Sequence, residues 1–110
     1  KLNDVFLHHG DIASGSLSVG DEIQLEVNAS ARRDTMANHS ATHLMHWALR
    51  KTLGDHLTQA GSLVEPDRLR FDFTHDKPLS EEEIEKIENL VNQEIAMSHS
   101  VNPKVCSFKQ

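Results

Sequence analysis

The spacing between apolar residues changes several times along the chain, and each change restricts the fold that the sequence can adopt. Apolar side chains recur at helical spacing over residues 35–53 and 80–98, whereas Leu69, Phe71 and Phe73 alternate with polar residues. A period near 3.6 residues predicts an amphipathic helix, and a period of two predicts a strand with one buried face. The sequence therefore predicts an α+β fold, in which two main helices pack on antiparallel strands.

Residues at the ends of the two helical segments support this division. Asp34 is a favourable N-cap for the first helix, and Gly54 stands where a glycine commonly ends one. Ser80 and Glu83 have the spacing of a capping box at the start of the second helix. The helices are therefore expected near residues 35–53 and 80–98.

The segment between the two helices is typical of a β-hairpin. Within residues 56–75, the apolar residues Leu63 and Val64 precede Pro66, a residue type that favours turns, and Leu69, Phe71 and Phe73 follow it. The alternation after the turn predicts one apolar and one charged face. Beyond the second helix, a further strand is expected over residues 101–108.

The first part of the chain also shows strand periodicity. Ile23, Leu25 and Val27 alternate with polar residues, which predicts β structure within residues 4–30. Two or three short strands do not form a stable sheet alone, so they are expected to pack against other parts of the protein. The Arg32-Arg33 step is expected to join this region to the helical part.

Composition and charge exclude several classes of protein. No apolar run approaches the ~20 residues that span a bilayer, so a membrane protein is excluded. The chain has 17 acidic and 11 basic residues and a net charge of -6, which argues against a protein that coats a nucleic-acid duplex. A single cysteine, Cys106, excludes an internal disulfide framework and favours a reducing compartment, the cytoplasm.

His39 and His43 form the candidate site that residue type and spacing indicate. Histidines at positions i and i+4 lie about 6 Å apart on one helix face, where two neutral imidazoles can bind one Zn²⁺ ion. With 8 histidines in 110 residues, about 0.6 pairs of this spacing are expected by chance. No glutamate lies between the two, which excludes the zinc-protease helix motif. The pattern alone leaves two interpretations open: a metal site, or histidines that are exposed or satisfied within the protein.

Three longer segments, taken in order, resemble a known family. They are residues 33–46 (RDTMANHSATHLMH), 59–64 (QAGSLV) and 69–75 (LRFDFTH). Together with the following helix they resemble the editing domain of alanyl-tRNA synthetases, which is also the second additional domain of threonyl-tRNA synthetases. The resemblance implies that residues 1–31 are part of a small β-barrel. It also implies that residues 32–110 are the N-terminal part of the editing domain, whose C-terminal part is missing from this chain.

The resemblance implies a hydrolytic function. Members of the family cleave the ester that joins a wrong amino acid, serine or glycine, to the 3′ end of alanine tRNA. Other domains of the same synthetase carry out ATP-dependent aminoacylation. A second site is needed because a pocket for alanine cannot exclude glycine sterically and rejects an added hydroxyl poorly.

The matched positions imply roles for four residues. His39 and His43 correspond to the zinc ligands of the family. Thr42 corresponds to a threonine whose hydroxyl can hydrogen-bond the serine side chain, and Gln59 to a residue of the amino-acid pocket. Thr42 and Gln59 are therefore the candidate catalytic residues, and Zn²⁺ is the expected cofactor.

The implied partner is the acceptor end of alanine tRNA. Basic residues that are candidates to meet its phosphates are Arg32, Arg33, Arg50, Lys51, Arg68 and Arg70.

The chain departs from the family pattern in its metal site. The family completes that site with a downstream Cys-x-x-x-His, whereas here Cys106 is followed four residues later by Gln110. The remaining ligands are expected outside the 110 residues, and the chain alone is expected to be an inactive fragment. Three alternatives stay open: a freestanding or threonyl-type editing protein, a non-catalytic piece that docks tRNA or packs between domains, and a structural metal module.

Overall fold

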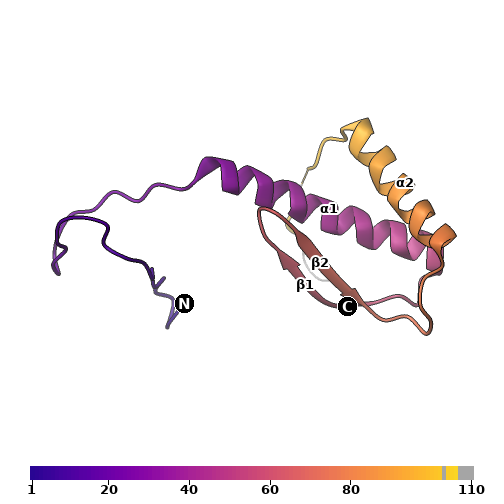
Figure 1. The fold of residues 1–110 in the computed structure, drawn as a ribbon, viewed down its shortest axis with the longest axis horizontal. Helices are drawn as coiled ribbons and strands as arrows, with labels where there is room; N and C mark the ends of the chain where they lie inside the picture. The colour runs from indigo at the N-terminus through magenta and orange to yellow at the C-terminus, as the bar shows by residue number, and fades with distance from the viewer. Residues whose placement is uncertain (103, 107–110) are drawn as a thin grey trace.

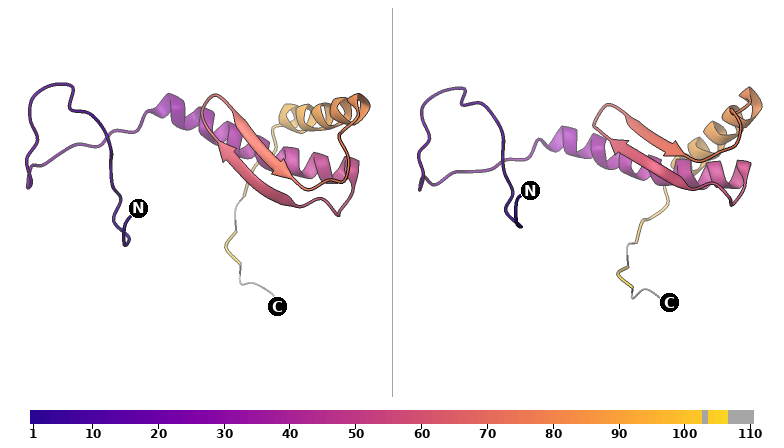
Figure 2. Two further views of the ribbon diagram at one scale, coloured as in Figure 1. Left: turned by 60° about the horizontal axis from the view of Figure 1, so that its bottom comes forward. Right: turned by 90° about the horizontal axis from the view of Figure 1, so that it is seen from below.

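The structure, a computed structural model, describes residues 1–102 and 104–106 of the chain. Within these residues lie two helices and one antiparallel hairpin, in the order α1 (Ala29–Leu53), β1 (Gln59–Val64), β2 (Leu69–Phe73) and α2 (Glu81–Met97) (Figure 1). The predicted α+β class, with two main helices and antiparallel strands, is confirmed. The hairpin and α2 both contact α1, which is the central element of the fold (Figure 2).

The helix α1 starts earlier than the sequence predicts. It begins at Ala29, and its N-cap is Asn28, whose side-chain oxygen accepts a hydrogen bond from the amide of Ala31 at 3.0 Å. The prediction of Asp34 as the N-cap is therefore wrong. Residues 29–34 contain no glycine or proline and several good helix formers, so nothing prevents the helix from extending back to Asn28.

Two other helix ends agree with the sequence prediction. Gly54 follows α1 at a φ of 120° and donates its amide hydrogen to the carbonyl of Arg50 at 2.9 Å. At the start of α2, the Ser80 side chain accepts a hydrogen bond from the amide of Glu83 at 3.2 Å. The Glu83 carboxylate in turn accepts one from the amide of Ser80 at 2.8 Å, which completes the predicted capping box.

β1 and β2 form the predicted hairpin, with one irregularity that affects the position of a site residue. Ser62 pairs with Phe71 in regular antiparallel register, but the register shifts between Gln59 and Gly61. Such a β-bulge adds one residue to a strand and reverses the side-chain alternation beyond it. In a regular strand, Gln59 and Ser62 would point to opposite faces because they are three positions apart. The bulge pairs Gln59 with Phe73 and brings it onto the face that carries Ser62 and Phe71.

The core is small and lies at the C-terminal half of α1. Its buried apolar residues are Ala48 and Leu49 of α1, Leu57 of the following loop and Ile87 of α2. Partly buried side chains from both helices, from β2 and from the loop before α2 pack around them: Met45, Leu53, Phe71, Phe73, Leu79, Leu90 and Val91. The hairpin and α2 are therefore held against the same end of α1.

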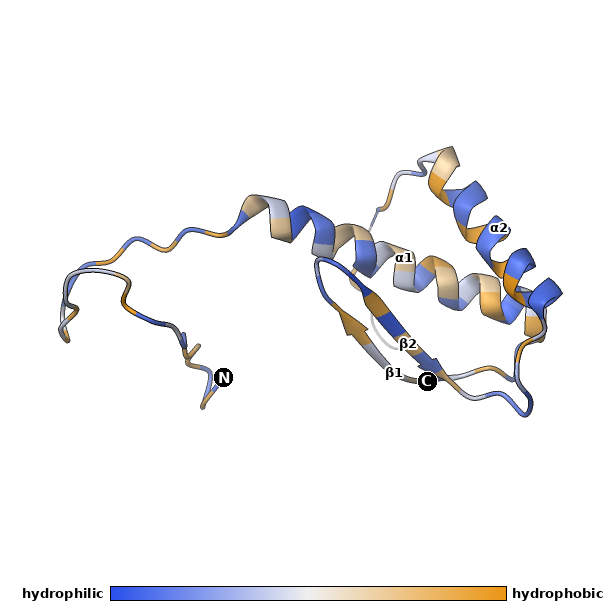
Figure 3. Ribbon diagram, in the orientation of Figure 1, coloured by the Kyte–Doolittle hydropathy of each residue, from blue (hydrophilic) through white to orange (hydrophobic). Residues whose placement is uncertain are grey.

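The N-terminal segment, residues 1–28, does not form the strands predicted within residues 4–30. In the described structure all of its residues are exposed, and its one β contact is an isolated bridge between Leu2 and Val5. Its apolar residues recur along an extended path (Figure 3). A strand is stabilised by pairing with a neighbour, and no other strand of the described residues lies beside this segment. The assignment of residues 1–31 to a small β-barrel stays a prediction.

Two further points concern the rest of the chain. Of the strand expected over residues 101–108, the described positions 101, 102 and 104–106 are not in a strand. The other positions of that span, and Gln110, lie outside the described residues. In the described part of the chain, no helix combines the length and the apolar character needed to cross a membrane.

Candidate functional site

His39 and His43 lie one turn apart on the same side of α1. Their Nε2 atoms are 3.3 Å apart, and their ring centroids are separated by 5.1 Å. In a tetrahedral Zn²⁺ site with bonds of 2.0–2.1 Å, two nitrogen ligands are about 3.3–3.4 Å apart. The separation of the two Nε2 atoms therefore fits a shared zinc ion.

The two imidazoles make up half of a tetrahedral set of ligands. Within the described residues, no cluster of three His, Cys, Asp or Glu ligands includes either histidine. Cys106 is exposed, and its thiol lies 4.0 Å from the carbonyl of Lys104. The described part of the chain therefore offers a pair of zinc ligands rather than a complete set.

A hollow of about 240 Å³ opens between the middle of α1 and the face of the hairpin that carries Gln59. The structure places all four residues predicted for the site around it: His39, Thr42, His43 and Gln59. The other wall residues are His46, Ser62, Val64 and Phe71. At ~30 Å³ for a water molecule, the space is large enough for a small amino-acid side chain and the groups beside it.

Thr42 is the buried polar residue of this hollow, with 6% of its surface exposed. Its Oγ1 donates a hydrogen bond to the backbone carbonyl of Asn38 at 2.8 Å. A hydroxyl has one hydrogen and two lone pairs, so Thr42 Oγ1 can still accept a hydrogen bond but has no hydrogen left to donate. A molecule that bonds to Thr42 in this conformation must bring a donor, such as a hydroxyl group.

Asn38 connects α1 to the tip of the hairpin. Its Nδ2 donates hydrogen bonds to the carbonyls of Glu65 at 2.8 Å and Pro66 at 3.1 Å. These bonds fix the position of the hairpin turn against the helix, at one end of the hollow. Helical periodicity does not reveal this role, because the partners lie in another element.

His46 is a wall residue that the sequence did not predict for the site. Its ring packs on Phe71 with 5.1 Å between centroids, and its Nε2 is buried without a hydrogen-bond partner among the described protein atoms. The available signal was its place three residues after His43, on the same helical stripe.

Two of the basic residues predicted to meet phosphates, Arg68 and Arg70, form ion pairs within the hairpin. Arg68 Nε is 2.6 Å from Glu65 Oε2, and Arg70 Nε is 3.2 Å from Asp72 Oδ1. Exposed ion pairs of this kind contribute only about 0–1 kcal/mol, so a phosphate can compete with the carboxylates. Because alternate residues of a strand face opposite sides, Arg70 points away from the hollow that Phe71 lines.

Comparison with known proteins finds relatives along nearly the whole chain. No protein-family model matches it. The alanine–tRNA ligase of Bdellovibrio bacteriovorus is 55% identical over 109 residues, that of Bradyrhizobium diazoefficiens 50% over 105, and that of Delftia acidovorans 54% over 106. These alignments cover 99%, 96% and 96% of this chain. The chain spans 12% of the length of each of the three relatives.

Proposed function

The chain is a segment of an alanine–tRNA ligase and belongs to that family. On this premise we propose that it forms part of an editing site for mischarged alanine tRNA. The substrates are Ser-tRNA(Ala) and Gly-tRNA(Ala), and the reaction is hydrolysis of the ester at the 3′ end of the tRNA. The observation that supports the proposal is the gathering of His39, His43, Thr42 and Gln59 around one hollow. The ATP-dependent ligase reaction belongs to other parts of the full-length protein.

His39 and His43 hold Zn²⁺ in this proposal, which their 3.3 Å separation supports. When bound, zinc would act as a Lewis acid that polarises an ester carbonyl or a water molecule. The family's Cys-x-x-x-His, located elsewhere in the full-length protein, completes the set of ligands. Since metal affinity falls with each ligand lost, we propose that this segment alone binds zinc weakly and is not an active hydrolase.

Thr42 and Gln59 act on the aminoacyl group. Thr42 Oγ1 accepts a hydrogen bond from the serine hydroxyl, which alanine cannot provide because it has no donor on its side chain. A buried acceptor left without a partner costs about 1–3 kcal/mol, so this contact favours serine over alanine and gives glycine no advantage. Gln59 carries both a donor and an acceptor at an exposed position of the hollow, where it orients the aminoacyl group.

The acceptor end of the tRNA approaches the hollow from the side on which His39 and His43 are exposed. Arg32 and Arg33, in the exposed first turns of α1, are the candidates on this helix to meet phosphates. The cytoplasm, where tRNA is aminoacylated, is the compartment that this function requires.

The test uses the full-length ligase that contains this segment. Replacing both His39 and His43 with alanine should abolish the release of serine from Ser-tRNA(Ala) and lower the zinc content of the protein. Aminoacylation with alanine should be retained, because other domains perform it. The matched control, His8→Ala with His9→Ala, removes two exposed histidines of the N-terminal segment and should change neither property.

The outcomes of this test distinguish the editing site from a docking element and show whether His39 and His43 bind the zinc. Unchanged hydrolysis in the His39→Ala/His43→Ala protein refutes the editing proposal. Unchanged hydrolysis together with weaker tRNA binding would instead identify a docking element. Zinc content that stays the same after both replacements would show that the metal is bound elsewhere.

A further inference from the structure

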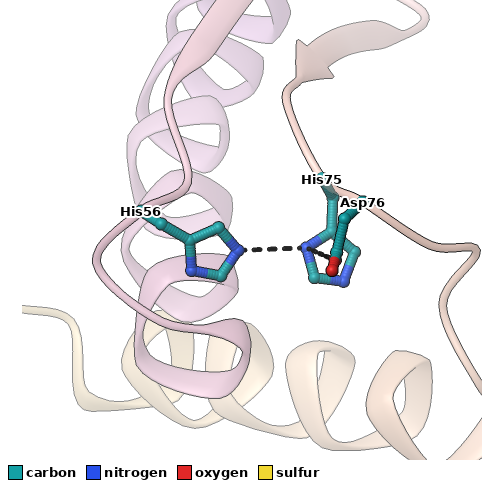
Figure 4. Close-up of side chains that lie close together, drawn as sticks. All are labelled: His56, His75 and Asp76. Carbon is teal, nitrogen blue, oxygen red and sulfur yellow. Dashed lines mark hydrogen bonds and ion pairs between the residues drawn. The ribbon is translucent and has the colours of Figure 1, made fainter.

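A second group of metal-binding side chains lies at the open end of the hairpin. It consists of His56, His75 and Asp76 (Figure 4), none of which lines the hollow. His56 lies in the loop between α1 and β1, and the other two residues follow β2. Within the described residues, this is the one group of three His, Cys, Asp or Glu side chains whose ligand atoms all lie within 4.8 Å of one another.

The backbone holds these two loops together just beyond the sheet. The amide of Thr74 donates a hydrogen bond to the carbonyl of Thr58 at 3.0 Å, and the hydroxyl oxygens of the two residues are 2.8 Å apart. His75 directly follows Thr74, and His56 precedes Thr58 by one intervening residue. The pairing of the two threonines therefore keeps both histidines at the same end of the hairpin.

Each imidazole is oriented by its surroundings. The side chain of His75 is 7% exposed, and its Nε2 is buried without a hydrogen-bond partner among the described protein atoms, so its polar contacts run through Nδ1. A Cβ on Gly54 would lie 2.9 Å from Nδ1 of His56, so the missing side chain leaves room for this ring. The Nε2 of His56 then faces His75 (Figure 4). Two rings held in this way lose little freedom when an ion binds.

Two of the three distances within the group are close to those between ligands of a single ion, and all three are within 4.8 Å. His56 Nε2 and His75 Nδ1 are 3.3 Å apart, and His75 Nδ1 and Asp76 Oδ1 are 3.6 Å apart. Two ligands of a tetrahedral zinc ion with bonds of 2.0–2.2 Å are about 3.3–3.5 Å apart. The Asp76 side chain is 85% exposed, so its carboxylate is free to close the small remaining difference.

We propose that His56, His75 and Asp76 form a binding site for a divalent transition-metal ion, and that Zn²⁺ is the ion they fit. Two imidazoles and one carboxylate are zinc ligands, whereas Ca²⁺ and Mg²⁺ prefer sites made of oxygen atoms. Three protein ligands leave the fourth position to water. The ion links the loop before β1 to the loop after β2, at the open end of a sheet that has only two strands in the described structure. This site does not depend on the editing proposal.

The simpler alternative is a direct hydrogen bond between the two imidazoles, which the 3.3 Å separation also allows. The two interpretations differ in their response to added metal. A hydrogen-bonded pair needs no ion, whereas a metal site takes up one Zn²⁺ per chain and loses it when a ligand is removed.

The test measures Zn²⁺ binding to the chain in which His39 and His43 are replaced by alanine, so that the other candidate pair does not contribute. Competition with a chromophoric zinc chelator at neutral pH should show one zinc bound per chain. Adding His56→Ala should lower the affinity about tenfold or more, and Asp76→Asn by a smaller factor. Co²⁺ in place of Zn²⁺ should give the visible absorption of four-coordinate cobalt, and His56→Ala should abolish it.

The controls separate loss of a ligand from loss of the fold. His56 and Asp76 are exposed, so their variants are used instead of a variant of His75, whose side chain is only 7% exposed. Circular dichroism verifies that these variants remain helical. His99→Ala is the matched control, because it removes an exposed histidine that pairs with Glu94, and it should leave the affinity unchanged. Absence of bound zinc, the same affinity with and without His56, or an equal loss in the His99 variant would overturn the proposal.

Discussion

Asn38 connects two parts of the candidate editing site, the hairpin turn and Thr42, through hydrogen bonds of its side chain and of its backbone. Its side-chain amide donates to the hairpin turn, and its backbone carbonyl accepts from the hydroxyl of Thr42. The hydrogen bond to Asn38 leaves Thr42 with lone pairs and no free hydrogen. At the scale of single residues, the chemistry that Thr42 can offer is therefore set by a neighbour on the same helix.

The first prediction concerns this hydroxyl. In the full-length ligase, Thr42→Val keeps the branched shape but removes the acceptor, so the hydrolysis of Ser-tRNA(Ala) should fall about fivefold, the equivalent of one hydrogen bond near 1 kcal/mol. The hydrolysis of Gly-tRNA(Ala) should change little, because glycine has no hydroxyl. Thr42→Ser is the matched control and should retain activity on both substrates. Equal losses on the two substrates would contradict a role in recognising serine.

A second prediction tests the link between α1 and the hairpin turn. Asn38→Asp preserves the shape of the side chain but places an acceptor against the carbonyl oxygens of Glu65 and Pro66. We expect Asn38→Ala to lower the free energy of unfolding by about 1–2 kcal/mol, and Asn38→Asp to lower it further through repulsion. Urea denaturation of the chain at neutral pH measures both. An aspartate variant as stable as the alanine variant would show that these two bonds do not hold the turn.

The candidate site was predictable from the sequence only in part. Spacing alone identified a histidine pair, and the family resemblance added Thr42 and Gln59. The contributions of Asn38 and His46 escaped prediction because they depend on other elements, the hairpin turn and Phe71 respectively.

At the scale of helices and strands, the features predicted correctly are those with local causes. The capping box of α2 and the glycine after α1 each act within one turn of the chain. The start of α1 was missed because Asn28 and Asp34 are both good caps, and the helix-forming residues between them decide in favour of the first. The bulge near Gln59 was missed because it is a property of two paired strands.

The capping box leads to a prediction about pH. The hydrogen bond from the Ser80 backbone lowers the pKa of Glu83 below its ordinary value of 4.5, and the nearby charge of Lys77 acts in the same direction. A carboxyl group whose pKa is lower in the folded state stabilises that state above its ordinary pKa, and loses this contribution as the pH falls through the lower value. The chain should therefore lose part of its stability below pH 4.5.

Substitution of the capping carboxylate tests this pH dependence. Glu83→Gln keeps an acceptor without the charge, so the loss of stability on acidification should be smaller than in the unmodified chain. Thermal unfolding from neutral pH to about pH 3 measures the difference. Glu82→Gln, in the same turn, should retain the original pH profile. If both variants follow that profile, Glu83 does not account for the acid-sensitive part of the stability.

At the scale of the whole molecule, the chain is far from compact. Its radius of gyration is 19.7 Å, whereas a compact domain of this length has about 13 Å. Its accessible surface is 9972 Å², against about 6,100 Å² for a compact protein of this mass. Much of the excess belongs to the N-terminal segment, where apolar residues such as Val19 and Val27 are exposed. We expect other parts of a full-length ligase to cover this surface.

Because the N-terminal segment is exposed along its whole length, we expect its removal to have little effect on stability. Removing residues 1–27 should change the free energy of unfolding by less than about 0.5 kcal/mol, because none of these residues is buried. Asn28→Ala, which removes only the N-cap, should cost more, about 1 kcal/mol, in the helicity or stability of the first turns of α1. Circular dichroism during thermal unfolding compares the two. A large loss on truncation would show that the segment packs against the helices in solution.

The uneven covering of α1 also determines how quickly its amide hydrogens exchange with solvent deuterium. Residues 29–37 and 45–53 belong to one continuous helix, but the core lies only against the second stretch. Opening the first stretch breaks helical hydrogen bonds without exposing this core, whereas opening the second also separates Leu49 from Leu57 and Ile87. Deuterium uptake should therefore be fast around Arg33 and slow around Leu49, so that a single helix divides into a part that frays and a part that opens only when the fold does.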